Sequence, residues 1–208
     1  MLAAWHPGDR TGLIWKETEL TDQPLIGKTI AILVANGFEE TEMTEPQRTL
    51  LKLGATVRVI SPEQGLVNGW LGAAWGHYFP TDKHVGDVLG ADFDLLVLPG
   101  GERSVAKLMN SAHTKRIVGH FLDAGKGIAA IDDGVRLLAQ AQKIKGRQMT
   151  GAASAEAEAT AEGGTWVDEP VVTDKTLVTA RGLADLDAFV AEMTRVFIAI
   201  AEQRRAAA

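Results

Sequence analysis

The 208-residue chain contains no cysteine. This absence excludes a disulfide, a thiolate metal site and a cysteine nucleophile. The chain also lacks any apolar run close to the roughly 20 residues that a membrane span needs. Its first ten residues read MLAAWHPGDR and lack the basic segment and apolar core that are typical of a secretory signal. Together these absences predict a soluble, cytoplasmic protein.

Basic residues are in the minority. Lys and Arg number 21 against 27 Asp and Glu, which gives a formal net charge of −6. A negatively charged chain is a poor match for nucleic acid or for an anionic membrane, so we expect neither as a partner. Hydrophobic residues make up 46% and charged residues 23% of the chain, which is typical of a globular domain.

The length fits one domain, which we expect to cover residues 27–203. Residues 1–26 form an extension that holds Trp5 and Trp15 among polar residues. Because tryptophan side chains gain from packing, we expect this extension to lie on the body or on a neighbouring subunit. Residues 204–208 form a short tail.

Four runs rich in apolar residues predict buried parallel strands. They cover residues 27–35, 55–60, 94–98 and 128–131. Helical patterns follow the first, third and fourth runs, at residues 39–53, 102–124 and 135–141. Alternating strands and helices of this length form βαβ units with a parallel sheet. Residues 61–92 show no such pattern and are expected to be irregular.

The last part of the chain has a different pattern. We expect a short strand at residues 147–150 and an Ala-rich helix at 152–161. Two further strands, at 166–174 and 176–180, form a hairpin. An amphipathic helix then lies on the sheet. The predicted fold class is α/β, a flavodoxin-like three-layer α/β/α sandwich with a mostly parallel sheet and a late β-hairpin.

Two turns follow predicted strands and carry the candidate site. Asp132 and Asp133 come directly after the run at 128–131, and Gly100 and Gly101 come after the run at 94–98. Both turns lie at the carboxyl edge of the sheet, where open α/β sheets hold their ligands. The two acids are either a site or ordinary helix caps, a role in which Asp is common. The glycines allow a backbone N–H to approach a ligand closely.

The other polar candidates favour structural roles. His113 and His120 lie seven residues apart on a predicted helix, which is too far for two ligands of one metal. Glu156 belongs to a solvated helix face, and Trp166 packs on the sheet. Arg181 either binds a carboxylate or acts as a cap. We therefore predict no metal and no cofactor.

Several motifs occur in order along the chain. They are NGFEE at 36–40, GHYFPTDK at 76–83, DLLVLPGG at 94–101, WVDEPVV at 166–172 and LVTARG at 177–182. Their order resembles the ThiJ/PfpI family of class I glutamine amidotransferase-like proteins, most closely its PfpI-like intracellular protease or deglycase branch. The resemblance covers about residues 27 to 200 and implies a homodimer or larger oligomer.

The resemblance breaks where that family carries its chemistry. The family's nucleophile is a cysteine in a segment similar to AAICHG, whereas residues 129–134 here read AAIDDG. Asp132 thus takes the position of the cysteine, and Asp133 that of the histidine. The resemblance implies that Glu39 lies beside this position, and that Gly101 and the backbone of Asp133 form an oxyanion hole. Val105 stands where the PfpI-like branch has a glutamate that acts on a neighbouring subunit.

Three hypotheses follow for Asp132. As a nucleophile it would form an acyl- or alkyl-enzyme, which needs a base such as Asp133, Glu39 or His77 to resolve it. As one of a carboxyl pair with Glu39, it would act in general acid and base catalysis on a small carbonyl or hydratable substrate. In the third hypothesis the site is not catalytic, and Asp132 resembles the sulfinate that an oxidised family cysteine becomes.

We favour the third hypothesis, a non-catalytic, stress-related or small-molecule-binding oligomer. The alternative is a hydrolase or lyase that acts on a small carbonyl, ester or amide through Asp132 and Glu39. The catalytic alternative requires Glu39, Asp132 and Gly101 to line one open cleft. The non-catalytic hypothesis allows that cleft to be filled, for example by Trp75 or Tyr78.

Overall fold

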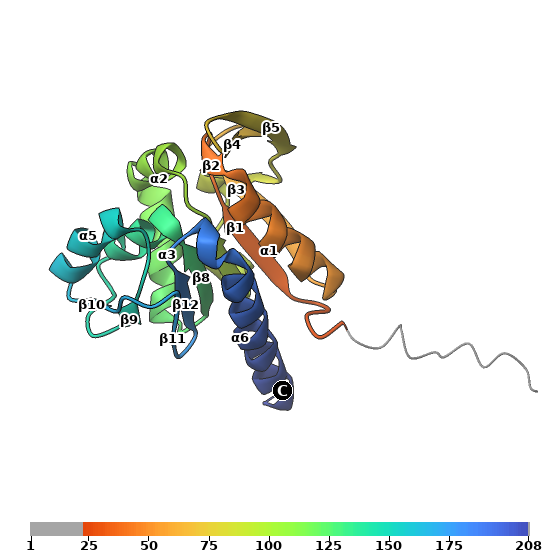
Figure 1. The fold of residues 1–208 in the computed structure, drawn as a ribbon. Helices are drawn as coiled ribbons and strands as arrows, with labels where there is room; N and C mark the ends of the chain where they lie inside the picture. The colour runs from red at the N-terminus through yellow and green to blue at the C-terminus, as the bar shows by residue number, and fades with distance from the viewer. Residues whose placement is uncertain (1–22, 208) are drawn as a thin grey trace, which may run out of the picture.

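The computed structural model describes residues 23–207 and is built around one seven-stranded sheet (Figure 1). The strand order is β11-β12-β8-β7-β1-β3-β6. Six of these strands are parallel, and β11 alone runs antiparallel, beside β12. The strands are β1 (Thr29–Leu33), β3 (Thr56–Ser61), β6 (Lys83–His84), β7 (Leu95–Leu98), β8 (Gly127–Ile131), β11 (Val171–Asp174) and β12 (Leu177–Ala180).

Helices cover both faces of this sheet, as alternate residues of β1 show. Ile30 and Ile32 pack in one core with α1 (Glu40–Lys52) and α6 (Leu186–Ala206). Ala31 and Leu33 pack in a second core on the other face. The helices of that second face are α2 (Glu102–Met109), α3 (Ala112–Asp123), α4 (Arg136–Gln140) and α5 (Glu156–Ala161). The predicted three-layer sandwich with a late hairpin, β11–β12, is therefore confirmed.

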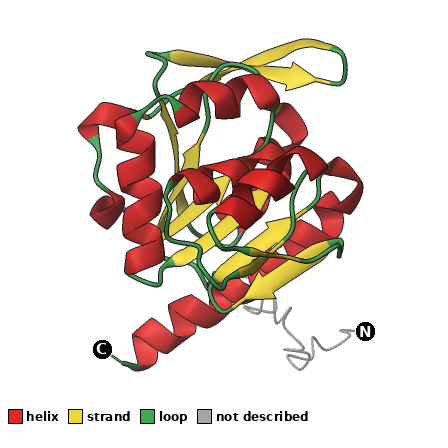
Figure 2. Cartoon of the chain, turned by 90° about the vertical axis from the view of Figure 1, so that its left-hand side faces the viewer, coloured by secondary structure: helices red, strands yellow, loops and turns green. Residues whose placement is uncertain are grey.

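The prediction that residues 61–92 are irregular is wrong. They contain β4 (Leu66–Leu71) and β5 (Ala74–Pro80), an antiparallel hairpin that extends beyond the main sheet (Figure 2). The short strand β2 (Phe38–Glu39) pairs with β4 and completes a three-stranded sheet. Trp70 and Trp75 face each other across the hairpin with ring centroids 5.5 Å apart. This aromatic pair stabilises a hairpin whose glycines and polar residues hide the alternation of a strand.

The prediction of one strand over residues 166–174 is also wrong. β10 (Thr165–Trp166) pairs with β9 (Gln148–Met149) in a separate two-stranded sheet, whereas β11 belongs to the main sheet. Pro170 lies between the two strands and lacks the N–H that a continuous ladder requires. The predicted helix over residues 102–124 is likewise divided: α2 ends at Met109 with Asn110 as its C-cap, and Ser111 caps α3 by accepting a hydrogen bond from Thr114 N.

The ends of the chain extend the sandwich. Helix α6 continues to Ala206, past the position at which we expected the tail to begin. Of the expected N-terminal extension, residues 1–22 lie outside the described residues, while Leu25 is fully buried against α1 and α6. The described residues contain no helix that is long and apolar enough to cross a membrane.

Candidate functional site

Three parallel strands end at the same edge of the sheet and place three loops around one carboxylate. Asp132 follows β8, Gly100 follows β7 and Gly182 follows β12. A Cβ atom on Gly100 would lie 2.5 Å from Asp132 Oδ2, and one on Gly182 would lie 3.5 Å from Asp132 Oδ1. The two oxygens of Asp132 thus face different loops, and the side chain is enclosed between them.

The turn that carries Asp132 is strained. Asp132 has a φ of 56°, in the left-handed region that few residues other than glycine adopt, and it begins a 3₁₀ turn, Asp132–Val135. Asp tolerates this conformation better than most residues. The next turn residue is Gly134, whose added Cβ would lie 2.2 Å from the carbonyl oxygen of Leu98. This close approach forces the chain into an elbow that presents Asp132 at the edge of the sheet.

Glu42 is the second carboxyl of the site. It comes from the first turns of α1, its side chain is 1% exposed, and its Oε2 accepts a hydrogen bond from Gly100 N at 2.8 Å. The added Cβ on Gly100 would lie 2.7 Å from this oxygen, so Glu42 and Asp132 flank the same glycine. Burial, followed by the negative charge of Asp132, raises the pKa of Glu42 to about 9. Glu42 is therefore protonated at neutral pH.

Backbone amides act directly on Asp132. Burial raises the pKa of Asp132, while hydrogen bonding from the N–H groups of Asp133 and Gly101 opposes this shift and favours the ionised form. Amides in this position stabilise an anion at the start of a helical turn. The donors that the resemblance implied as an oxyanion hole thus interact with the chain's own carboxylate.

Glu39 lies at the margin of this pair. Its N–H donates to Gly100 O at 3.1 Å, which ties α1 to the loop after β7. Its side chain is half-buried, and its Oε1 has no hydrogen-bond partner among the described residues. Burial is the largest cause that raises the pKa of Glu39, and the negative charge of Asp132 raises this pKa further. The charge of Asp132 therefore affects Glu39, but Glu42 is the carboxyl that lies with Asp132 against Gly100.

We assigned no role to Glu42 from the sequence, because acids in a first helical turn usually complement the helix dipole. A signal was nevertheless present. Glu39 and Glu42 are three residues apart at the start of a helix, a spacing that places both side chains on one face. If one of them faces the elbow, the other does so too.

The other predicted residues take different positions. Asp133 accepts a hydrogen bond from Ser154 Oγ at 2.8 Å through its side chain. His77 contacts Glu40 at 2.7 Å, which pins the β4–β5 hairpin to α1. Val105 is fully buried in the core. Across the described residues, no group of three or more His, Asp and Glu side chains could hold a metal ion.

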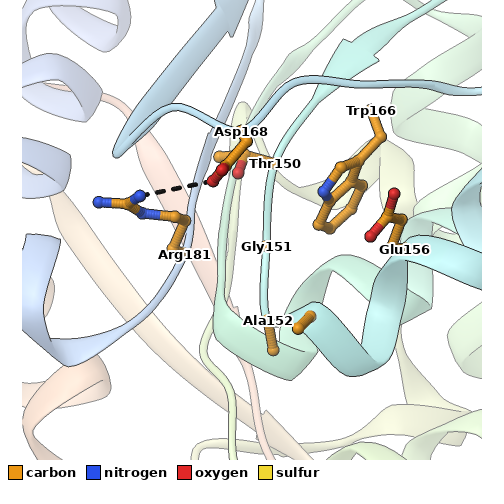
Figure 3. Close-up of a pocket in the computed structure, with 8 residues that line it drawn as sticks. Thr150, Gly151, Ala152, Glu156, Trp166, Asp168 and Arg181 are labelled. Atoms are coloured by element: carbon orange, nitrogen blue, oxygen red, sulfur yellow. Dashed lines mark ion pairs between the residues drawn. The ribbon is translucent and has the colours of Figure 1, made fainter.

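The elbow is not filled by the aromatic residues that we considered. Trp75 and Tyr78 on β5 are 54% and 69% exposed. A cavity of about 420 Å³ lies next to the elbow, where Ala152 N donates to Asp132 O at 3.3 Å (Figure 3). The residues that line this cavity do not include Asp132, Glu39 or Gly101. Its chemistry differs from that of the elbow and is treated separately below.

A parallel α/β sheet with a strained strand-to-helix elbow at its carboxyl edge defines a class of proteins that hold reactive groups there. Within this class, the model of the DJ-1/PfpI family matches residues 28–195. The chain belongs to the DJ-1/PfpI family.

Known proteins agree with this assignment. Protein/nucleic acid deglycase 2 of Escherichia coli (strain K12) is 35% identical over 173 residues, covering 82% of this chain and 98% of that protein. General stress protein 18 of Bacillus subtilis is 34% identical over 166 residues, covering 79% of this chain and 94% of that protein. Deglycase PfpI of Pyrococcus furiosus is 30% identical over 167 residues, covering 80% and 98% of the two chains.

Solved structures show the same fold. A two-domain protein from Anabaena variabilis, with DJ-1/ThiJ/PfpI-like and ferritin-like domains, superposes with a TM-score of 0.75 at 27% identity. The match covers 81% of this chain and 47% of that one, so the chain spans about half the length of that protein. DJ-1 of Schizosaccharomyces pombe superposes with a TM-score of 0.70 at 18% identity, over 84% of this chain and 97% of that one.

Substitution of Gly134 tests the strained elbow. Gly134→Ala places a Cβ against the Leu98 carbonyl, so we expect the free energy of unfolding to fall by about 3 kcal/mol. Urea denaturation followed by circular dichroism measures this change. Gly119→Ala on α3 is the matched control, because its Cβ meets only the Lys143 side chain at 3.6 Å. Equal stability of the two variants would contradict the account of the elbow.

The pKa of Glu42 predicts a pH dependence of stability. Since the pKa of Glu42 is about 9 in the folded chain, against an ordinary glutamate value of 4.5, the unfolded chain loses this proton first as pH rises. The proton's contribution to stability is therefore complete below pH 4.5 and is lost as pH rises toward 9. Glu42→Gln remains neutral, so we expect it to raise the free energy of unfolding at pH 8 by roughly 2 kcal/mol.

Thermal denaturation of wild type and Glu42→Gln at several pH values checks this prediction. The difference in Tm between the two should be small near pH 5 and should grow toward pH 8, since only the wild type carries the titrating carboxyl. Glu45→Gln, on the same helix but in contact with Arg48, is the matched control. A Glu42→Gln variant that is less stable than wild type at pH 8 would show that Glu42 is ionised in the folded protein.

Proposed function

We propose that the chain is a non-catalytic member of the DJ-1/PfpI family, in which a fixed carboxylate replaces the reactive thiol. The observation that carries this proposal is the environment of Asp132. The N–H groups of Gly101 and Asp133 favour its ionised form. An oxyanion hole works only if its donors are free to bind the charge that develops on the substrate. Here the chain's own carboxylate competes for those donors.

The same geometry supports the comparison with an oxidised cysteine. A sulfinate is an anion with two oxygens, and it forms irreversibly in most proteins. Asp132 supplies two oxygens and a negative charge at the same position of the elbow, and Glu42 supplies a protonated neighbour. We infer that the elbow permanently holds the anionic state that a thiol-bearing relative reaches only on oxidation.

The biological role that we propose is that of a cytoplasmic, stress-related or ligand-binding homo-oligomer. The names of relatives support the stress-related role, since one relative is named general stress protein 18 and two of those compared above are named deglycases. The loss of the thiol removes the thiolate route from this chain, because none of its 208 residues is cysteine. The retained fold, together with an elbow that already holds the Asp132 carboxylate, supports a binding role best.

One observation favours a second candidate, a hydrolase or lyase that acts on a small carbonyl, ester or amide. Carboxyl groups whose pKa values are driven apart are typical of acid and base catalysis. The pKa of Glu42 is raised to about 9, whereas backbone amides limit the rise that burial causes in the pKa of Asp132. In this candidate Asp132 is the base, and Glu39 or Glu42 supplies the proton.

Turnover assays separate the two candidates. Wild type, Asp132→Asn and Asp132→Cys would each be incubated with methylglyoxal, small esters and peptidyl amides, and product and intact mass would be followed. We expect no turnover by wild type and Asp132→Asn, and a mass adduct with methylglyoxal in Asp132→Cys, because a thiol at the elbow restores a nucleophile. Asp187→Asn, an exposed change on α6, is the control. Wild-type turnover that Asp132→Asn abolishes would overturn the proposal in favour of the carboxyl pair.

A further inference from the structure

The cavity beside the elbow has features that the role of Asp132 leaves unexplained. It has a volume of about 420 Å³, which lies in the range of small-molecule sites. Its lining residues come from three stretches of the chain, 150–156, 166–168 and residue 181 (Figure 3). Those that matter here are Thr150 after β9, Glu156 at the start of α5, Trp166 at the end of β10, Asp168 before β11 and Arg181 after β12.

A buried hydroxyl in this cavity has no partner. Thr150 is 1% exposed, and its N–H donates to Thr179 Oγ1 at 2.9 Å. Its own Oγ1 has no hydrogen-bond partner among the described residues, although Thr150 lines the cavity. A buried polar group that stays unpaired costs free energy, and native proteins satisfy nearly all of them. A ligand with a hydrogen-bond donor would satisfy the hydroxyl oxygen.

The charges in the cavity favour a cation. Arg181 is the one cationic residue among those lining it, and its guanidinium binds Asp185 at 2.9 Å and Asp168 at 3.5 Å. Asp185 lies outside the lining and neutralises Arg181. Glu156 forms no ion pair within the described part of the chain, and the Asp168 side chain is 89% exposed. The lining thus offers a positively charged ligand one unpaired carboxylate, Glu156, and a second, Asp168, that shares Arg181 with Asp185.

The aromatic ring lies between these two carboxylates. In Figure 3, the indole of Trp166 lies beside Glu156, and Asp168 lies on the opposite side of the ring. Indole is the best of the aromatic rings at attracting a cation, and its face also packs against methylene groups. A ligand with a positive charge at each end and an apolar middle would match this order of carboxylate, indole and carboxylate.

We propose that this cavity binds a small alkyl diamine. One ammonium group pairs with Glu156, the other pairs with Asp168, and the methylene chain lies on Trp166. The Thr150 hydroxyl accepts a hydrogen bond from one ammonium group. This site is independent of the role proposed for Asp132, since neither Asp132 nor Glu42 lines the cavity.

Calorimetric titration with 1,4-diaminobutane at low ionic strength tests the proposal. We expect saturable binding with one ligand per chain, and no binding of 1,4-butanediol, which has the same chain but no charge. Glu156→Gln removes one carboxylate from an exposed position and should weaken binding about tenfold, the effect of losing one charge-assisted hydrogen bond. Glu169→Gln makes the same charge change outside the cavity lining and should leave affinity within about twofold, as expected for an exposed charge that does not touch the ligand.

Fluorescence provides a second readout that does not depend on heat. Diaminobutane should change the tryptophan emission of the wild type, and Trp166→Phe should abolish this change if the ring lies against the ligand. The proposal is overturned if diaminobutane does not bind, if butanediol binds as tightly, or if Glu156→Gln and Glu169→Gln weaken binding equally. The last result would mean non-specific attraction to a negatively charged protein.

Discussion

The structure of the candidate site depends on one enclosed carboxylate, that of Asp132, and on backbone amides that limit the rise in its pKa. Asp132 is held at a φ of 56° by a turn that only a glycine at position 134 allows. Its oxygens face Gly100 on one side and Gly182 on the other, and both glycines leave room for it. The amides of Gly101 and Asp133 then favour its charge. Without this carboxylate, the two loops would enclose unpaired N–H donors in a partly buried site.

Electrostatics accounts for the second carboxyl. Two ionised carboxylates against the same glycine would repel strongly in a buried environment, so one of them stays protonated. Glu42 is the more deeply buried of the two, and among the described residues the amide of Gly100 alone opposes the rise in its pKa. The fold thus keeps two carboxyl groups at this edge of the sheet, of which Glu42 holds its proton at neutral pH.

The features that could be predicted from the sequence are those set by local pattern. Continuous apolar runs such as residues 128–131 indicate buried parallel strands, and the acids directly after them indicate a turn at the sheet edge. The β4–β5 hairpin was missed because its stability comes from contact between Trp70 and Trp75 across the strands rather than from alternation. Glu42 was missed because burial of an acid depends on the loop after β7, about 60 residues away, which local sequence cannot show. The cavity beside the elbow was missed for the same reason, since its lining comes from three separate stretches of the chain.

The central claim is that Glu42 keeps its proton at neutral pH beside Asp132. Carbon-13 NMR titration of the side-chain carboxyl carbons measures this directly, with Asp132→Asn and Glu42→Gln used to assign the two signals. We predict that Glu42 keeps its proton until the pH approaches about 9, and that Asp132 titrates above the ordinary aspartate pKa. A Glu42 signal that titrates near the ordinary glutamate pKa of about 4.3 would contradict the account. It would mean that the elbow holds two charges, and that the amides do not decide which carboxyl carries the proton.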